Sequence, residues 1–139
     1  MVKGRLKSMG KVNINERIRA RNVRLNKVSA EKINGLPKDD IVEISQKTKA
    51  EIIHSASDSL SIKANTKITI VPESLFTIEI EHIIDYKLVT KLSDKEVTDN
   101  IKELLIPIAP EISFIVSFLT KKMLETHIIL PPKLDIKIE

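Results

Sequence analysis

Reactive side chains are scarce in this sequence of 139 residues, which contains three histidines and no cysteine. The lack of cysteine excludes disulfides, thiolate metal sites and thiol nucleophiles. His54 and His82 could begin a zinc site, but no credible third and fourth ligand accompanies them, so we interpret both as hydrogen-bonded residues of the core. The motifs of serine hydrolases, P-loop nucleotide-binding proteins and zinc metalloproteases do not occur. We therefore expect a protein that is not an enzyme and that needs no metal or other cofactor.

Basic side chains offer a different chemistry, the binding of anions. Residues 1–32 hold ten basic and two acidic side chains, and Arg17, Arg19 and Arg21 form a row with alternate spacing. A protein that binds single-stranded nucleic acid would combine such a row with stacking aromatic residues, and none of the few aromatic residues interleaves with it. We favour cross-strand ion pairs over the binding of nucleic acid or of an acidic polypeptide. The expected partners are Glu43, Glu51, Glu79 and Glu81.

Four segments that alternate between apolar and polar residues are expected to position these side chains, because alternation is typical of half-buried β-strands. The first begins at Arg17, and a change of phase near Asn22 predicts a bulge. A loop is predicted over 29–40. A short connection at 72–74 implies that the last two strands pair antiparallel. The three later strands are predicted over 41–54, 60–71 and 76–89.

Helical spacing replaces the alternation after these strands. Ser93 and Glu96 have the spacing of a capping box, and apolar residues then recur every three or four positions. Pro107 and Pro110 are expected to break this helix. A second stretch, 111–124, is apolar on more sides than one small sheet can cover, and 127–139 is predicted to be extended. The fold class is α+β: a four-stranded antiparallel sheet followed by a proline-broken helix packed on it.

The length and composition fit one domain, which we place at 15–139 after a basic flexible arm at 1–14. The arm has the positive start of a signal peptide but no apolar run behind it. The most apolar region, 104–119, is interrupted by proline and is shorter than the ~20 residues of a membrane helix. We expect a cytoplasmic protein without membrane insertion.

The order of these elements resembles the SecB family of export chaperones. Residues 104–111 read LLIPIAPE and resemble the "LFPYARE"-type stretch in the main helix of that family. Residues 122–132 read KMLETHIILPP and resemble the family's "G-x-F-P-x-L-x-L-x-P" segment after that helix. The predicted hairpin over 60–89 also matches in strand length and turn position. The resemblance covers about residues 15–137.

This resemblance implies an ATP-independent holdase that assembles as a dimer of dimers, a homotetramer, and binds unfolded polypeptides or preproteins in an apolar groove, with a role in protein transport. Small relatives of the family shield an antitoxin, so a dedicated partner of a toxin–antitoxin system is one alternative. A basic nucleic-acid-binding accessory protein is another. The export chaperones dock on the translocase motor through an acidic surface, and the basic start of this chain counts against such docking.

Apolar residues in excess of the expected core locate two surfaces, one for client polypeptide and one for other subunits. Five of them lie on the charged side of the strands, where they are strand-end residues, subunit contacts or client contacts: Ile41, Ile53, Val71, Ile83 and Val89. Phe114 and Phe118 are the largest side chains of the apolar helix and its natural anchors. By resemblance, the loop over 29–40 forms a wall of the groove. The client-binding residues are assigned as Leu36, Val42, Ile44, Ile83, Phe114, Phe118 and Met123, and the oligomer interface as Ile18, Val23, Ile112, Ile115 and Leu119.

Overall fold

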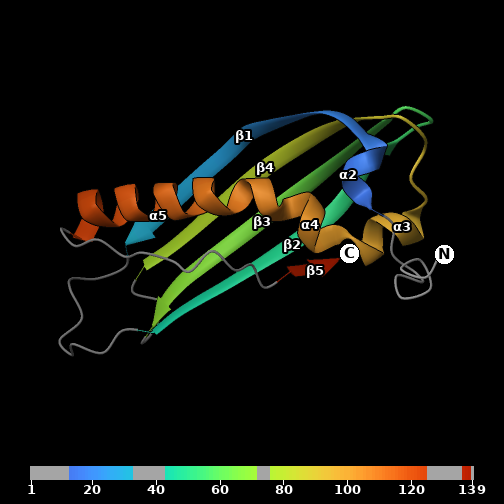
Figure 1. The fold of residues 1–139 in the computed structure, drawn as a ribbon. Coiled ribbons are helices and arrows are strands. Elements are labelled where there is room, and N and C mark those ends of the chain that lie inside the picture. Colours follow the sequence, from blue (N-terminus) through green and yellow to red (C-terminus); the bar gives the residue numbers. More distant parts are fainter. Residues whose placement is uncertain (1–12, 33–42, 72–75, 125–135, 139) are drawn as a thin grey trace.

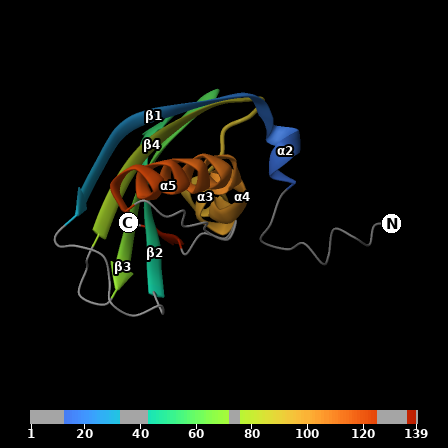
Figure 2. The same ribbon diagram turned by 90° about the vertical axis from the view of Figure 1, so that its left-hand side faces the viewer.

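A curved β-sheet wraps around a helical segment in the computed structural model, which describes residues 13–32, 43–71, 76–124 and 136–138 (Figures 1 and 2). All the helices that follow the sheet in sequence lie on its concave side, and the convex side is open (Figure 2). The fold is therefore two layers deep, with the core between the sheet and the helices. This arrangement confirms the predicted α+β class, with strands first and helices after.

The sheet has the spatial order β1-β4-β3-β2-β5, in which the four long strands are antiparallel. The fifth strand, β5, lies in the predicted extended tail and pairs parallel with β2, which sequence analysis did not anticipate. Pairing of the first strand with the fourth makes β1 an edge strand of the described sheet. The bounds are β1 (Ile18–Lys32), β2 (Glu43–Ser55), β3 (Ser59–Val71), β4 (Phe76–Leu88) and β5 (Ile136–Ile138).

The predicted bulge near Asn22 is wrong. Pairing of β1 with β4 continues without interruption through Asn22, and the irregularities fall between Ile18 and Ala20 and between Leu25 and Lys27. The strand also runs on to Lys32, so the predicted loop begins at least four residues too early. A loop composition alone cannot exclude residues from a strand when a neighbouring strand supplies partners for their backbone groups.

A third irregularity, between Ile52 and His54 in β2, overturns the interpretation of His54 as a core residue. One extra residue in a strand reverses the faces of the residues that follow it. His54 is consequently exposed, and its Nε2 lies 2.9 Å from the Ser59 hydroxyl. His82, by contrast, is fully buried on the core face of β4, as predicted.

The helices begin with α2 (Ile14–Arg17), which precedes the sheet, and Ile14, assigned above to the arm, is buried in the core. The capping box at Ser93 is confirmed: the Glu96 amide donates to the Ser93 hydroxyl at 3.1 Å, and the Ser93 amide donates to the Glu96 carboxylate at 3.0 Å. It starts α3, and the remaining helical elements follow closely. They are α3 (Asp94–Asp99), α4 (Ile101–Leu105), the 3₁₀ turn η1 (Ile106–Ile108) and α5 (Ala109–Leu124).

The proline break is milder than its sequence implies. Pro107 lies in η1 and Pro110 in the first turn of α5, where a missing N–H costs little. The helical segment Ile101–Met123 is thus 23 residues long and, by length and composition alone, sufficient to cross a membrane, which the sequence estimate of 104–119 missed. One side of it packs on the sheet, however, and Leu104, Leu105 and Val116 belong to the core.

Isoleucines fill most of the space between the two layers. On β3 and β4 the alternation holds throughout, because no bulge interrupts their pairing. The Tyr86 hydroxyl crosses the core and donates a hydrogen bond to the Leu104 carbonyl at the end of α4. The largest fully buried residues are Tyr86, Ile14, Leu60, Ile62, Ile68, Ile78, Ile80, Ile84, Leu92 and Leu104.

Candidate binding groove

An apolar stripe runs along the outer side of the helical segment. Residues four apart lie on one side of a helix, so Ile106, Pro110, Phe114 and Phe118 share the side that faces away from the sheet. Phe114 and Phe118 are 70% and 51% exposed, and their rings stack with centroids 6.3 Å apart. The core is complete without these side chains, because the sheet is covered by the opposite side of α5.

The edge strand β1 adds apolar residues beside this stripe. Leu25 pairs with His82 and Val28 pairs with Ile80, both of which are buried under the helices, so all four lie on the concave face of the sheet. Leu25 and Val28 nevertheless remain 48% and 39% exposed. Their exposure follows from the position of β1 at the edge of the sheet. This strand arches past the side of α5, and α5 covers the inner strands more fully (Figure 2).

A groove lies where the two sets meet. Leu25 of β1 and Pro110, Glu111, Phe114 and Ile115 of α5 line a hollow of about 450 Å³. Its lining is apolar except for Glu111, and its volume is within the range of small ligand sites. A hollow of this volume has room for a few side chains of an extended polypeptide.

A buried histidine ties the groove to the sheet. The Nε2 atom of His82 lies 3.1 Å from Oε1 of Glu111, whose side chain is half exposed in the groove. The other ring nitrogen, Nδ1, is buried without a hydrogen-bond partner among the described residues. Because Glu111 lies in the first turn of α5, this contact fixes the start of that helix against β4.

Client-binding residues predicted from the sequence fall in different places. Phe114 lines the groove, Phe118 stacks on Phe114 beside it, and Met123 packs partly buried against the core. Ile44 lies on the concave face but on β2, across the sheet from the groove. Ile83 is on the convex face, where it pairs with Lys63, so it does not line this groove. Leu36 and Val42 lie outside the described residues.

Leu25 and Pro110 line the groove but were absent from the predicted set. Leu25 has the phase of a core residue, and only the knowledge that β1 is an edge strand reveals its exposure. Pro110 was interpreted as a helix breaker. A spacing of four from Ile106 to Phe118 was the signal that could have found it.

The residues predicted for the oligomer interface are mostly half buried. Ile18, Val23, Ile115 and Leu119 each pack against the core and keep part of their surface exposed. The assignment of Ile112 to the oligomer interface is wrong. The residue is only 1% exposed, so it belongs to the core and has no surface left for another subunit. Of the apolar residues expected on the charged side of the strands, Ile53 and Val89 are exposed near strand ends. Ile41 and the side chain of Val71 lie outside the described part.

The arginine row does not form the predicted cross-strand pairs. Arg17 lies in α2 and bonds the loop and helix after β4: its guanidinium is 3.0 Å from Glu96 and 2.6 Å from the Lys91 carbonyl. Arg19 and Arg21 form no ion pair with a described residue. The cross-strand ion pair of β1 is instead Arg24 with Asp85, at 2.9 Å, and the hydrogen bond from Arg24 lowers the pKa of Asp85.

No family model matches the chain, and no curated protein sequence does. Solved structures do match. The SecB-like chaperone Rv1957 of Mycobacterium tuberculosis, in complex with a ChAD peptide from the Rv1956 HigA1 antitoxin, is 12% identical, with a TM-score of 0.76 over 89% of this chain and 96% of its own. A protein of unknown function from Streptococcus agalactiae is 16% identical, with a TM-score of 0.54 over 81% and 95% of the two chains. The chain therefore has the fold of a SecB-like chaperone, which confirms the fold that the sequence resemblance implied.

Proposed function

We propose that this chain is an ATP-independent, non-enzymatic chaperone of the cytoplasm that holds unfolded polypeptide in the groove between β1 and α5. The observation that carries this proposal is the stacked pair Phe114 and Phe118, which stands exposed beside an apolar hollow. Large apolar side chains that stand exposed together on a folded domain mark a site for a partner. The absence of shape-specific polar contacts in the groove favours apolar chain segments of varied sequence.

The energetics favour several weak contacts rather than one tight site. A buried aromatic residue removes about 150–250 Å² from water, and at roughly 25 cal/mol per Å² the exposed parts of two phenylalanines contribute only a few kcal/mol. Ordering an unfolded chain costs a comparable amount. One groove would therefore hold a client weakly, and useful retention would need several grooves in one assembly.

Assembly into a dimer of dimers is accordingly part of the proposal. The edge strand β1 is 15 residues long and pairs on only one side within the described sheet. Long unpaired edges in soluble proteins are usually covered. Ile115 and Leu119 flank the stripe with half-buried surfaces that a second subunit could complete.

Two kinds of client are compatible with the proposed groove: unfolded proteins in general, or one particular antitoxin. The Mycobacterium tuberculosis neighbour is described in complex with an antitoxin peptide, which supports a polypeptide ligand in this fold. A dedicated partner of one antitoxin is therefore the second candidate, beside a general holdase that serves preproteins and a translocase motor. Competition separates the two: excess unrelated unfolded protein displaces an antitoxin segment from a general holdase and leaves it bound to a dedicated one.

Aggregation of a chemically denatured substrate, followed by light scattering, tests the chaperone proposal. We expect the protein to suppress aggregation without ATP and the variant Phe114→Ser/Phe118→Ser to lose most of that effect. Val89→Ser is the matched control, because Val89 is equally exposed but lies just after β4, outside the groove. Equal suppression by the groove variant and the control, or none by the original protein, would contradict the proposal.

A further inference from the structure

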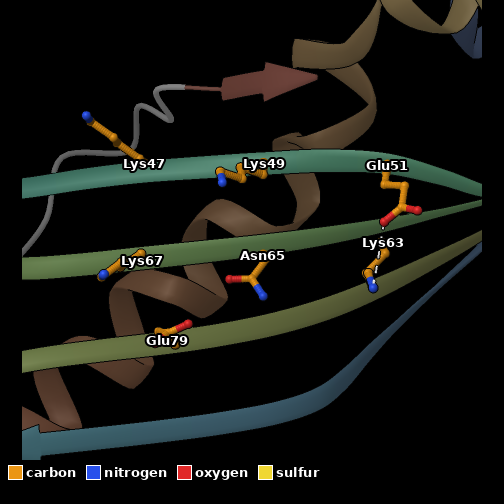
Figure 3. A pocket seen from close by; sticks show the side chains of 7 residues that line it. All are labelled: Lys47, Lys49, Glu51, Lys63, Asn65, Lys67 and Glu79. Atoms are coloured by element: carbon orange, nitrogen blue, oxygen red, sulfur yellow. Dashed lines mark ion pairs between the residues drawn. The ribbon is translucent and has the colours of Figure 1, made fainter. Parts of the chain in front are cut away.

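The convex face of the sheet carries a cluster of lysines that the proposed groove does not use. Lys47 and Lys49 of β2 and Lys63 and Lys67 of β3, here called the lysine face, point away from the helices (Figure 3). With them, Glu51, Asn65 and Glu79 line a shallow hollow of about 440 Å³. The groove and the lysine face are thus on opposite sides of the sheet.

Two of these lysines lie in positions that lower the stability of the sheet. Lys47 stands directly opposite Lys67 in the pairing of β2 with β3, and like charges in that position destabilise a sheet. Lys63 has a partner, since its Nζ lies 3.7 Å from Glu51. Lys67 stands opposite Glu79 in the next pairing, yet neither Lys47 nor Lys67 forms an ion pair with a described residue.

We propose that the lysine face docks an extended acidic segment of a partner polypeptide. Charge complementarity supports the acidic partner, because Lys47 and Lys67 lie side by side on adjacent strands without an ion pair to a described residue and attract carboxylates. Alternate residues of an extended chain lie about 6.6 Å apart. A segment with carboxylates at alternate positions therefore matches the spacing of Lys47 and Lys49 along β2. Asn65 lies among the lysines and offers both a donor and an acceptor to a peptide backbone.

Nucleic acid fits this face less well than an acidic polypeptide. Single-stranded nucleic acid is held by aromatic side chains on which bases stack, and no aromatic residue lines the hollow. Glu51 and Glu79 stand among the lysines and would repel a continuous phosphate backbone. A polypeptide can leave neutral residues opposite these two carboxylates, whereas a phosphate backbone carries a charge at every nucleotide.

Fluorescence anisotropy with a labelled Glu-Ser repeat peptide tests this proposal on the full chain. We expect salt-sensitive binding, weakened at least about tenfold by Lys47→Glu/Lys67→Glu. Lys102→Glu/Lys121→Glu is the matched control, because both residues are exposed lysines of the helical segment and the change in net charge is equal. A Gln-Ser peptide and a single-stranded oligonucleotide complete the set of probes. Tighter binding of the oligonucleotide, with the same loss in the lysine-face variant, would overturn the proposal, as would an equal loss in the control.

Two further measurements separate this site from loss of folding and from the groove. Lys47→Gln/Lys67→Gln relieves the opposed charges, so we expect it to unfold no earlier than the original protein on heating while it binds the acidic peptide less. The same variant should suppress aggregation normally, and Phe114→Ser/Phe118→Ser should bind the acidic peptide normally. The proposal for the lysine face would therefore remain valid if the groove proposal failed. The groove proposal would likewise remain valid if the lysine-face proposal failed.

Discussion

Tyr86 is the only tyrosine of the chain, and it joins the two layers of the fold. Its buried hydroxyl donates to the Leu104 carbonyl, at the point where α4 gives way to η1. We expect Tyr86→Phe to lower the free energy of unfolding by about 1–3 kcal/mol, because the carbonyl is left buried without its donor. Urea denaturation at neutral pH measures this loss. A change within error would mean that the carbonyl finds another donor.

Alkaline pH provides a second test of the same hydroxyl. Burial raises the pKa of Tyr86 to about 12, from 10.0 in an unfolded chain. A pKa that is higher in the folded state gives stability that is complete below pH 10 and is lost as the pH rises towards 12. The stability difference between the original protein and Tyr86→Phe should therefore narrow over this interval. A difference that stays constant would contradict the burial of an un-ionised hydroxyl.

Glu96 makes stability depend on acid pH. The hydrogen bond from the Ser93 amide, and then that from Arg17, lower the pKa of Glu96 below its usual 4.5. A lowered pKa gives stability that is present above pH 4.5 and is lost as the pH falls further. We expect Glu96→Gln to cost at most about 1 kcal/mol at neutral pH, because the Arg17 pair is partly solvated. The difference in the free energy of unfolding between the original protein and Glu96→Gln should vanish at acid pH. Urea denaturation at a series of pH values measures it. Glu103→Gln, in the exposed first turn of α4, is the control for the loss of one carboxylate.

Single residues were predictable from the sequence where the strand around them is regular. His82 lies in β4, whose pairing with β3 has no irregularity, and its burial followed from alternation. His54 follows a bulge in β2, and its exposure could not be predicted because Ile52 and Ile53 are equally apolar. Phe114 and Phe118 were identified as anchors, but their exposure depends on which side of α5 the sheet covers.

At the scale of elements, the capping box at the start of α3 is a local device that both sequence and structure show. The Ser93 hydroxyl accepts from the Glu96 amide and thereby satisfies a helix N–H that has no partner in the helix. We expect Ser93→Ala to lower the free energy of unfolding by about 1 kcal/mol. Ser93→Gly should cost less than Ser93→Ala, because glycine is tolerated at a cap. Chemical denaturation of the two variants measures both values, and an equal cost would argue against a capping role.

Elements whose bounds depend on residues close in sequence were predicted well. Elements whose bounds depend on pairing with a distant strand were not. The capping box and the hairpin of β3 and β4 depend on residues close in sequence. The end of β1 depends on β4, which supplies partners for Ser29, Ala30 and Lys32 from a distant part of the chain. The groove depends on the same pairing, since it exists only because β1 is at the edge and α5 covers the strands beside it.

At the scale of the molecule, the curved sheet separates two surfaces of opposite character. The concave side has an apolar groove at its margin, and the convex side has the lysine face. The groove and the lysine face have no lining residue in common. The proposed functions are compatible for this reason, since client and acidic partner would not compete for the same residues.

Assembly of the chain into an oligomer can be tested through α5. Phe118 lies on the outer side of α5 and is not needed for the core, so Phe118→Asp should leave the sheet folded. A carboxylate beside the subunit contact that we propose for Ile115 and Leu119 is costly to remove from water, and we expect the variant to dissociate. Light scattering coupled to size exclusion gives the mass, and circular dichroism gives the retained strand content. Lys121→Gln, at a nearby exposed position on the same helix, controls for the change of one unit in net charge. A folded variant whose mass equals that of the original oligomer would remove α5 from the interface, and an original protein that is monomeric at all concentrations would remove the assembly itself.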